Sequence, residues 1–167
     1  MSYHGFASYN SQDKQAVKSA CASLRSQAPA LKLWYDGEDF PVGSGVATGL
    51  FAGIDKCNHL LIFVGPNGLG RYQKDEINYG FQKYHASRGA FRTIPIFLGG
   101  AKPPAWLLSI AGVRWKGTPD DQWRKLARFL LHSPGSSEPL GAPAYAESGA
   151  WEVLRPTVWL GQLAALV

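Results

Sequence analysis

The sequence predicts an α/β fold in which a five-stranded parallel sheet carries helices on both faces. Short apolar runs typical of strands alternate five times with segments whose apolar residues recur at helical spacing. One run, Leu60 to Val64, is apolar throughout, as expected for a strand that is covered on both faces. The chain has 167 residues and is 46% hydrophobic, which is enough to bury a sizeable core.

The first part of the chain supplies two strands and two helices. A strand is predicted over residues 5–9, and Asn10 or Ser11 is the expected cap of the helix that follows. A second strand is predicted over residues 31–35 and a second helix over residues 46–57. The apolar stripe of the first helix is expected to consist of Ala16, Val17, Ala20 and Leu24.

The segment after the third strand is the candidate functional region. Three glycines within residues 65–70 allow a tight turn and leave space for a ligand beside the sheet. A helix is predicted from about Tyr72, with Ile77, Phe81 and Tyr84 on its apolar side. Glu76 therefore lies in the first turn of a helix that begins just beyond a buried strand, where open α/β sheets bind ligands. We expect Glu76 to be a catalytic carboxylate, although a helix cap is an equally good reading of its position alone.

The rest of the chain completes one domain, expected to span residues 1–131. A fourth strand over 93–97 contains Pro95, which cannot donate to a ladder, so an edge or bulged position is expected. A fifth strand is predicted over 113–115. Residues 132–149 form a Pro/Gly/Ser-rich linker, and residues 150–167 are an apolar segment that is either a docking helix or the start of a further region. The last helix of the domain is expected to turn Trp123, Leu126, Phe129 and Leu130 inward.

Five alternating units fit the flavodoxin-like strand order 2-1-3-4-5, a three-layer sandwich with its switch point between strands 1 and 3. The crevice there would be lined by residues 9–10 and 65–76. The first strand–helix turn lacks the glycine fingerprint of a dinucleotide-binding Rossmann fold, and the chain has no phosphate-binding loop with a Gly-Lys-Ser/Thr sequence.

Charge and composition narrow the ligand classes. The formal net charge of +5 favours an anionic ligand such as a dinucleotide pyrophosphate, or an acidic partner. Direct nucleic-acid binding is not expected, because the basic residues are interspersed with core residues. Four scattered histidines predict no metal site, and Cys21 and Cys57 are expected to be reduced core thiols. With no leader and no run long enough to span a membrane, we expect a cytoplasmic protein.

Three motifs, in order and at matching spacing, resemble a TIR (Toll/interleukin-1 receptor) domain of the bacterial type. Residues 6–13 resemble the family's opening strand and turn, and residues 34–43 resemble its strand B and BB loop. Residues 64–77 resemble the glycine turn and αC helix of prokaryotic members. The resemblance covers about residues 4–130.

The resemblance implies an activity and a set of site residues. Catalytic members cleave NAD+ at the nicotinamide–ribose bond with a glutamate four residues after an aromatic residue. Glu76 takes the glutamate position here, and Tyr72 stands where many members have Trp. Further substrate contacts are implied for Phe6, Ser8, Tyr9, Asn10, Asp39 and Phe40, and a BB-loop interface for Asp39, Phe40, Pro41, Val42 and Gly43.

The sequence thus predicts an NAD+ glycohydrolase (NADase), with or without cyclisation of the ADP-ribose product, that acts as an effector of bacterial antiviral immunity. NAD+ is its substrate, no cofactor is expected, and self-association of TIR domains is expected to activate it. The segment 150–167 would contact a partner or a further domain. The alternative is a non-enzymatic adaptor that binds other TIR domains through the BB loop.

Overall fold

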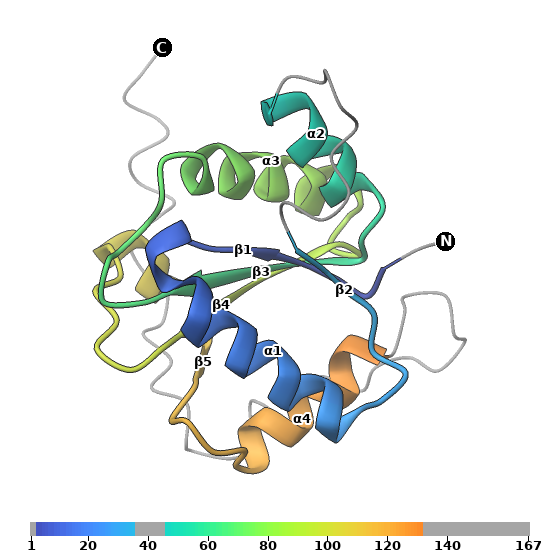
Figure 1. Cartoon of the computed structure of the whole chain (residues 1–167). Helices are drawn as coiled ribbons and strands as arrows, with labels where there is room; N and C mark the ends of the chain where they lie inside the picture. The colour runs from blue at the N-terminus through green and yellow to red at the C-terminus, as the bar shows by residue number, and fades with distance from the viewer. Residues whose placement is uncertain (1–2, 36–45, 132–167) are drawn as a thin grey trace.

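The computed structural model describes residues 3–35 and 46–131. Within them, five parallel strands form one sheet in the order β2-β1-β3-β4-β5 (Figure 1). This is the predicted flavodoxin-like order. The BB-loop residues 39–43, the linker and the C-terminal segment lie outside the described residues. The strands are β1 (Gly5–Ser8), β2 (Leu33–Tyr35), β3 (His59–Val64), β4 (Arg92–Phe97) and β5 (Val113–Arg114).

Helices cover both faces of the sheet, which confirms the three-layer architecture (Figure 1). On one face lie α1 (Lys14–Gln27) and α4 (Asp121–Leu131), and on the other lie α2 (Val46–Asp55) and α3 (Gln73–Ala86). Two short 3₁₀ helices, η1 (Ser11–Asp13) and η2 (Ala105–Ser109), complete the elements. None of the helices within residues 3–35 and 46–131 is long and apolar enough to cross a membrane.

Strand β3 is the centre of the fold because its side chains enter both cores. Leu61 and Phe63 belong to the core beneath α1 and α4. Leu60, Ile62 and Val64 belong to the core beneath α2 and α3. All six residues of β3 are buried, as predicted for a strand that is covered on both faces.

Several expected core positions are confirmed. Trp123, Leu126 and Leu130 of α4 are buried. Cys21 and Cys57 are free and buried, and burial raises the pKa of each thiol to about 12. A thiol with such a pKa remains protonated and unreactive at neutral pH.

Two helical stripes differ in part from prediction. In α1 the expected Val17, Ala20 and Leu24 are buried, whereas Ala16 is exposed and Cys21 completes the inner face. In α3 the buried residues are Gln73, Glu76, Ile77 and Gly80, whereas Tyr84 is 37% exposed. Both sets follow the spacing i, i+3, i+4, i+7 of a single helix face. The inward face of α3 begins with two polar residues, which an apolar pattern alone does not select.

The expected edge or bulged position of the fourth strand is wrong: β4 lies inside the sheet, between β3 and β5. The backbone nitrogen of Trp115 donates to the carbonyl oxygen of Phe97 (2.8 Å), so the backbone hydrogen-bonding groups of Phe97 point towards β5. The backbone nitrogen of Pro95, two residues earlier, points in the same direction. Because β5 pairs only with Ile96 and Phe97, Pro95 lies beyond the paired segment and its missing N–H costs no ladder bond.

Candidate active site at the ends of β1 and β3

Glu76 lies in the first turn of α3 with its side chain against the sheet, and it is 5% exposed. The glycine turn after β3 delivers the chain to Tyr72, and the backbone nitrogen of Glu76 donates to the carbonyl oxygen of Tyr72 at 3.1 Å. The peptide dipoles of α3 make its first turn favourable for a negative charge. The fold thus places the buried carboxyl group of Glu76 at the edge of the sheet where the parallel strands end.

Ser8 is the residue that meets this acid. Its hydroxyl donates a short hydrogen bond to the Oε2 atom of Glu76, and Ser8 itself is 1% exposed. Side chains alternate along β1, so Ser8 shares the α3 face of the sheet with Phe6, while Ala7 lies in the opposite core. The last residue of β1 and the first turn of α3 therefore meet at the predicted switch point.

Gln73 was not selected by sequence reasoning, although it is 2% exposed and lies one turn before Glu76. Its Nε2 atom donates to the carbonyl oxygens of Phe63 (2.8 Å) and Ser8 (3.2 Å). Its Oε1 atom accepts from the backbone nitrogen of Gly70 (2.7 Å). Its position on the same helix face as Glu76 and Ile77 was the available indication, because the amide of a buried glutamine must form its hydrogen bonds within the protein.

A second set of side chains holds the turn after β3 from the α1 side. Asn10 caps η1 by accepting from the backbone nitrogen of Gln12 (3.1 Å), as predicted for a cap. The Nδ2 atom of Asn10 donates to the carbonyl oxygen of Asn67 (3.1 Å). Asn67 in turn donates to Oδ1 of Asp13 (2.7 Å), which is 5% exposed. These contacts join the segment after β1 to the turn after β3 on the α1 side of the sheet.

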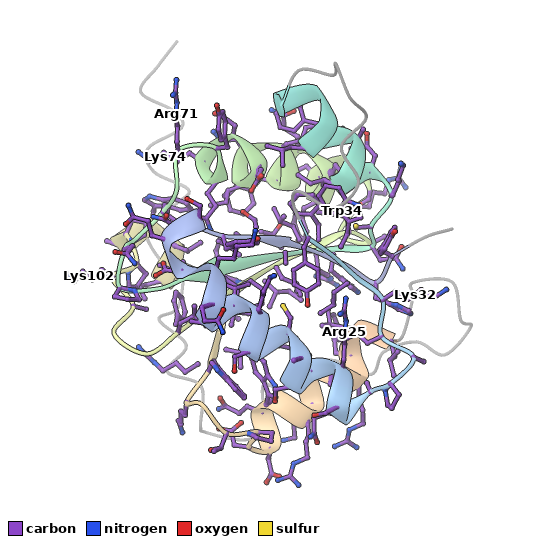
Figure 2. The ribbon with its side chains drawn as sticks, in the orientation of Figure 1. Arg25, Lys32, Trp34, Arg71, Lys74 and Lys102 are labelled. Carbon is purple, nitrogen blue, oxygen red and sulfur yellow. The ribbon has the colours of Figure 1, made fainter. Side chains whose placement is uncertain are left out.

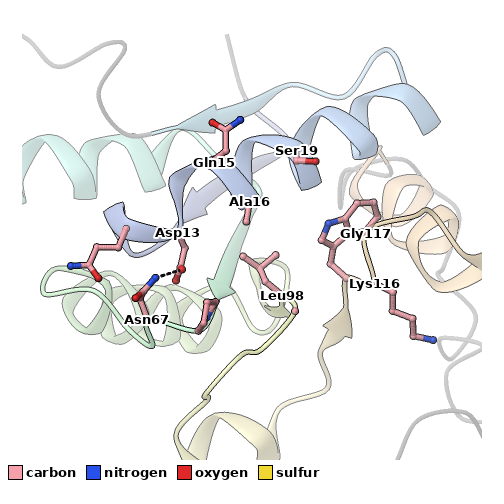
Figure 3. Close-up of a pocket in the computed structure, with 12 residues that line it drawn as sticks. Asp13, Gln15, Ala16, Ser19, Asn67, Leu98, Lys116 and Gly117 are labelled. Atoms are coloured by element: carbon pink, nitrogen blue, oxygen red, sulfur yellow. Dashed lines mark hydrogen bonds between the residues drawn. The ribbon is translucent and has the colours of Figure 1, made fainter.

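A pocket of about 820 Å³ opens on the α1 side of this edge (Figure 3). Figure 3 shows Asp13 and Asn67 on one wall, with Leu98 and Lys116 farther along. Its lining residues, all within the described chain, do not include Glu76, which faces the opposite side of the sheet. Topology predicts a single crevice here, but the ends of the strands separate the pocket on the α1 side from Glu76 on the other face of the sheet.

The comparison with protein families decides the identity of the fold. The family model described as TIR domain matches residues 6–130. The chain belongs to the TIR domain family. Comparison with curated proteins gives no significant match.

Solved structures show the same fold. The TIR domain of the Toll-related receptor TRR-2 from Hydra magnipapillata superposes with a TM-score of 0.61 at 17% identity, covering 78% of this chain and 100% of that one. A metazoan TIR-STING receptor from C. gigas superposes with a TM-score of 0.55 at 18% identity, covering 86% of this chain and 43% of that one. At these identities the likeness concerns the fold alone.

The implied substrate residues of this TIR domain are not all gathered in one place. Ser8 contacts Glu76 directly, whereas Asn10 contacts the turn after β3. Phe6 is fully buried and its ring stacks on Trp34 with centroids 4.7 Å apart. Tyr9 is 8% exposed and belongs to the core on the α1 side, away from Glu76. Asp39 and Phe40 lie outside the described residues.

Tyr72 presents a different surface from these buried residues. It stands at the start of α3, is 44% exposed, and has the Arg71 guanidinium 5.6 Å from its ring centroid. Figure 2 shows Arg71, Lys74 and Lys102 at the end of the molecule where α3 begins. An exposed ring and three bases beside the strand ends suit an aromatic ligand that carries phosphate.

The described residues contain no group of three or more His, Cys, Asp or Glu side chains placed to hold a metal ion.

Proposed function

We propose that this TIR domain cleaves NAD+ at the bond between nicotinamide and ribose, with Glu76 as the catalytic carboxylate. The supporting observation is the position of Glu76 in the first turn of α3, hydrogen-bonded to Ser8 at the end of β1. Its carboxyl group thereby lies at the switch point of the sheet, the location at which this topology binds ligands.

The chemistry of this bond suits a single carboxylate. The pyridinium of NAD+ leaves with the electron pair of the C–N bond and departs as neutral nicotinamide, so no acid must protonate it. Positive charge then develops on the ribose carbon, as in glycoside hydrolysis, and a preorganised anion stabilises it. Water adds to that carbon and releases a proton, giving ADP-ribose; attack by a ring nitrogen of the adenine gives a cyclic isomer instead.

The residues around Glu76 have supporting roles in this proposal. The hydroxyl of Ser8 holds one carboxylate oxygen in place, and the N-terminus of α3 favours the ionised form of Glu76. The exposed ring of Tyr72, one helical turn earlier, offers a face for the pyridinium. Arg71, Lys74 and Lys102 supply positive charge for the pyrophosphate.

The biological setting of the proposal is bacterial antiviral defence in the cytoplasm. An enzyme that depletes NAD+, or converts it to a nucleotide signal, must be silent until it is triggered. We propose that self-association through the BB-loop residues Asp39, Phe40, Pro41, Val42 and Gly43 provides that control, with the segment 150–167 contacting a partner.

A fluorogenic etheno-NAD+ analogue tests the activity on concentrated protein. Glu76→Gln keeps the length of the side chain and removes its charge, so we expect the cleavage rate to fall by at least about 100-fold. Asp75→Asn is the matched control, because Asp75 is the adjacent acid and is exposed. Equal rates for wild type and Glu76→Gln would overturn the assignment.

The adaptor alternative has one observation in its favour: a carboxylate bonded to Ser8 is also what a purely structural link between β1 and α3 requires. It predicts no cleavage by concentrated wild-type protein, together with TIR–TIR binding that Phe40→Ala abolishes and Glu76→Gln leaves intact.

Mass spectrometry of the products separates linear from cyclic ADP-ribose if cleavage is observed.

A further inference from the structure

Gln73 connects three backbone segments that converge beside Glu76. Its amide donates to the end of β1 at Ser8 and to β3 at Phe63, and accepts from the glycine turn at Gly70. These contacts use the donor and acceptor ends of one side chain that is 2% exposed. A buried amide with its groups satisfied in this way holds a fixed orientation.

Ser8 is the point at which Gln73 and Glu76 act on the same residue. The carbonyl oxygen of Ser8 accepts from Gln73, while the hydroxyl of Ser8 donates to Glu76. Gln73 and Glu76 are separated by one turn on one face of α3. The first turn of α3 is therefore hydrogen-bonded to both the backbone and the side chain of Ser8, the last residue of β1.

We propose that Gln73 is a positioning residue of the active site, which fixes the Glu76 carboxylate relative to the end of β1 where the ribose must bind. This inference rests on the proposed cleavage of NAD+ by Glu76. Gln73 does not touch the reacting atoms; it acts by holding Ser8 and the start of α3 in register.

Few side chains can replace Gln73, because the side chain at this position must donate to two carbonyl oxygens and accept from a backbone amide. Methionine has a similar length and can do neither. An ionised glutamate accepts but cannot donate, and would face the carbonyl oxygens of Ser8 and Phe63 with a negative charge. A protonated glutamate restores one donor and one acceptor.

These differences define the test, performed with the full chain and etheno-NAD+. In Gln73→Met we expect kcat, normalised to folded protein, to fall about 10–100-fold, because a misplaced catalytic group loses rate steeply. KM should change by less than about threefold. Gln82→Met is the matched control on the same helix, since Gln82 is exposed, and should leave both constants unchanged.

Gln73→Glu adds a pH readout of kcat normalised to folded protein, a normalisation that is needed because an ionised glutamate at this buried position also lowers stability in a pH-dependent way. Its kcat relative to wild type should rise as the pH is lowered from 8 to 5 and the new carboxyl group gains a proton. The same ratio for Gln73→Met should stay flat over this range. Circular dichroism and thermal melting report the folded fraction of each variant.

The outcomes separate this inference from the proposed function. Cleavage that needs Glu76 but keeps its kcat in Gln73→Met, with only a lower Tm, overturns the positioning role alone. Wild-type protein without Glu76-dependent cleavage overturns the proposed function, and the positioning role with it. Failure of both Gln73 variants to fold also contradicts the inference, which requires β1 and α3 to remain assembled with the carboxylate displaced.

Discussion

Buried polar side chains are concentrated where β1 and β3 end. The described residues bury five of them, and Ser8, Asp13, Gln73 and Glu76 lie at that edge, whereas His59 lies at the opposite end of β3. Burying a polar group lowers stability unless its hydrogen bonds are replaced within the protein. Four such groups at one edge indicate that geometry is maintained there against a cost in stability, as at many functional sites.

His59 supplies a prediction for the effect of pH on stability. Burial, helped by the charges of His4 and Arg92, lowers the pKa of His59 from 6.5 to about 4, and its ring nitrogens have no partner among the described residues. Between pH 6.5 and 4 the imidazole of His59 is therefore mostly protonated in the unfolded chain and mostly neutral in the folded chain. We expect the free energy of unfolding to fall by roughly 3 kcal/mol between pH 6.5 and 4 from this residue alone.

Urea denaturation at a series of pH values measures this effect. His59→Phe should flatten the pH dependence below 6.5. His85→Phe replaces an exposed histidine and should leave it as in wild type. An identical slope in wild type and His59→Phe would show that the buried imidazole is not the source.

At the scale of elements, the pairing of the turn after β3 with η1 depends on the absence of a side chain at residue 65. A Cβ atom on Gly65 would lie 2.5 Å from the Oδ2 atom of Asp13. Asp13 cannot move away without losing its hydrogen bond to Asn67. The close packing of these two segments therefore requires glycine, independently of the flexibility that glycine gives to a turn.

Gly65→Ala should consequently lower the free energy of unfolding by about 1–3 kcal/mol, the usual cost of overpacking a buried contact. Gly99→Ala is the matched control, because a Cβ atom at Gly99 has no neighbour within 4 Å and should change stability by less than about 0.5 kcal/mol. Chemical denaturation compares the two variants. Equal stability of both would mean that Asp13 relocates at no cost.

The elements show how far sequence patterns reach. Periodicity located the five strands and the four α-helices of residues 3–35 and 46–131, because a strand buried on both faces is uniformly apolar and an amphipathic helix repeats its stripe. It did not predict the short 3₁₀ helix η2. It also did not predict that the buried face of α3 includes Gln73 and Glu76, because both are polar and are buried only because they have hydrogen-bond partners. Their shared partner Ser8 lies more than 60 residues earlier in the chain, and no local pattern encodes such a contact.

At the scale of the whole molecule, the ends of β1 and β3 were predictable as the candidate site but its division was not. Topology alone places residues 9–10 beside residues 65–76. It does not say that Ser8 and Glu76 share one face of the sheet while Asn10, Asp13 and Asn67 hold the turn from the α1 side. That division follows from side-chain alternation along β1, which depends on register.

The proposed control by self-association predicts that activity depends on protein concentration. If the active species is an assembly, its fraction at low concentration follows mass action, and the specific activity should fall about tenfold on tenfold dilution. Etheno-NAD+ cleavage measured alongside light scattering over a dilution series checks this. Phe40→Ala should stay at the low, monomeric activity throughout, and a specific activity independent of concentration would contradict the proposal.

The position of Pro95 has a consequence for a domain proposed to assemble with copies of itself. Within residues 3–35 and 46–131, β5 pairs only with Ile96 and Phe97, so the outer side of β4 has no strand partner from Arg92 to Ile94. An unpaired stretch of this kind is where a strand of another chain could add to the sheet. Such a strand could extend the ladder no farther than Ile94, because Pro95 has no N–H group and is buried beside Gly112.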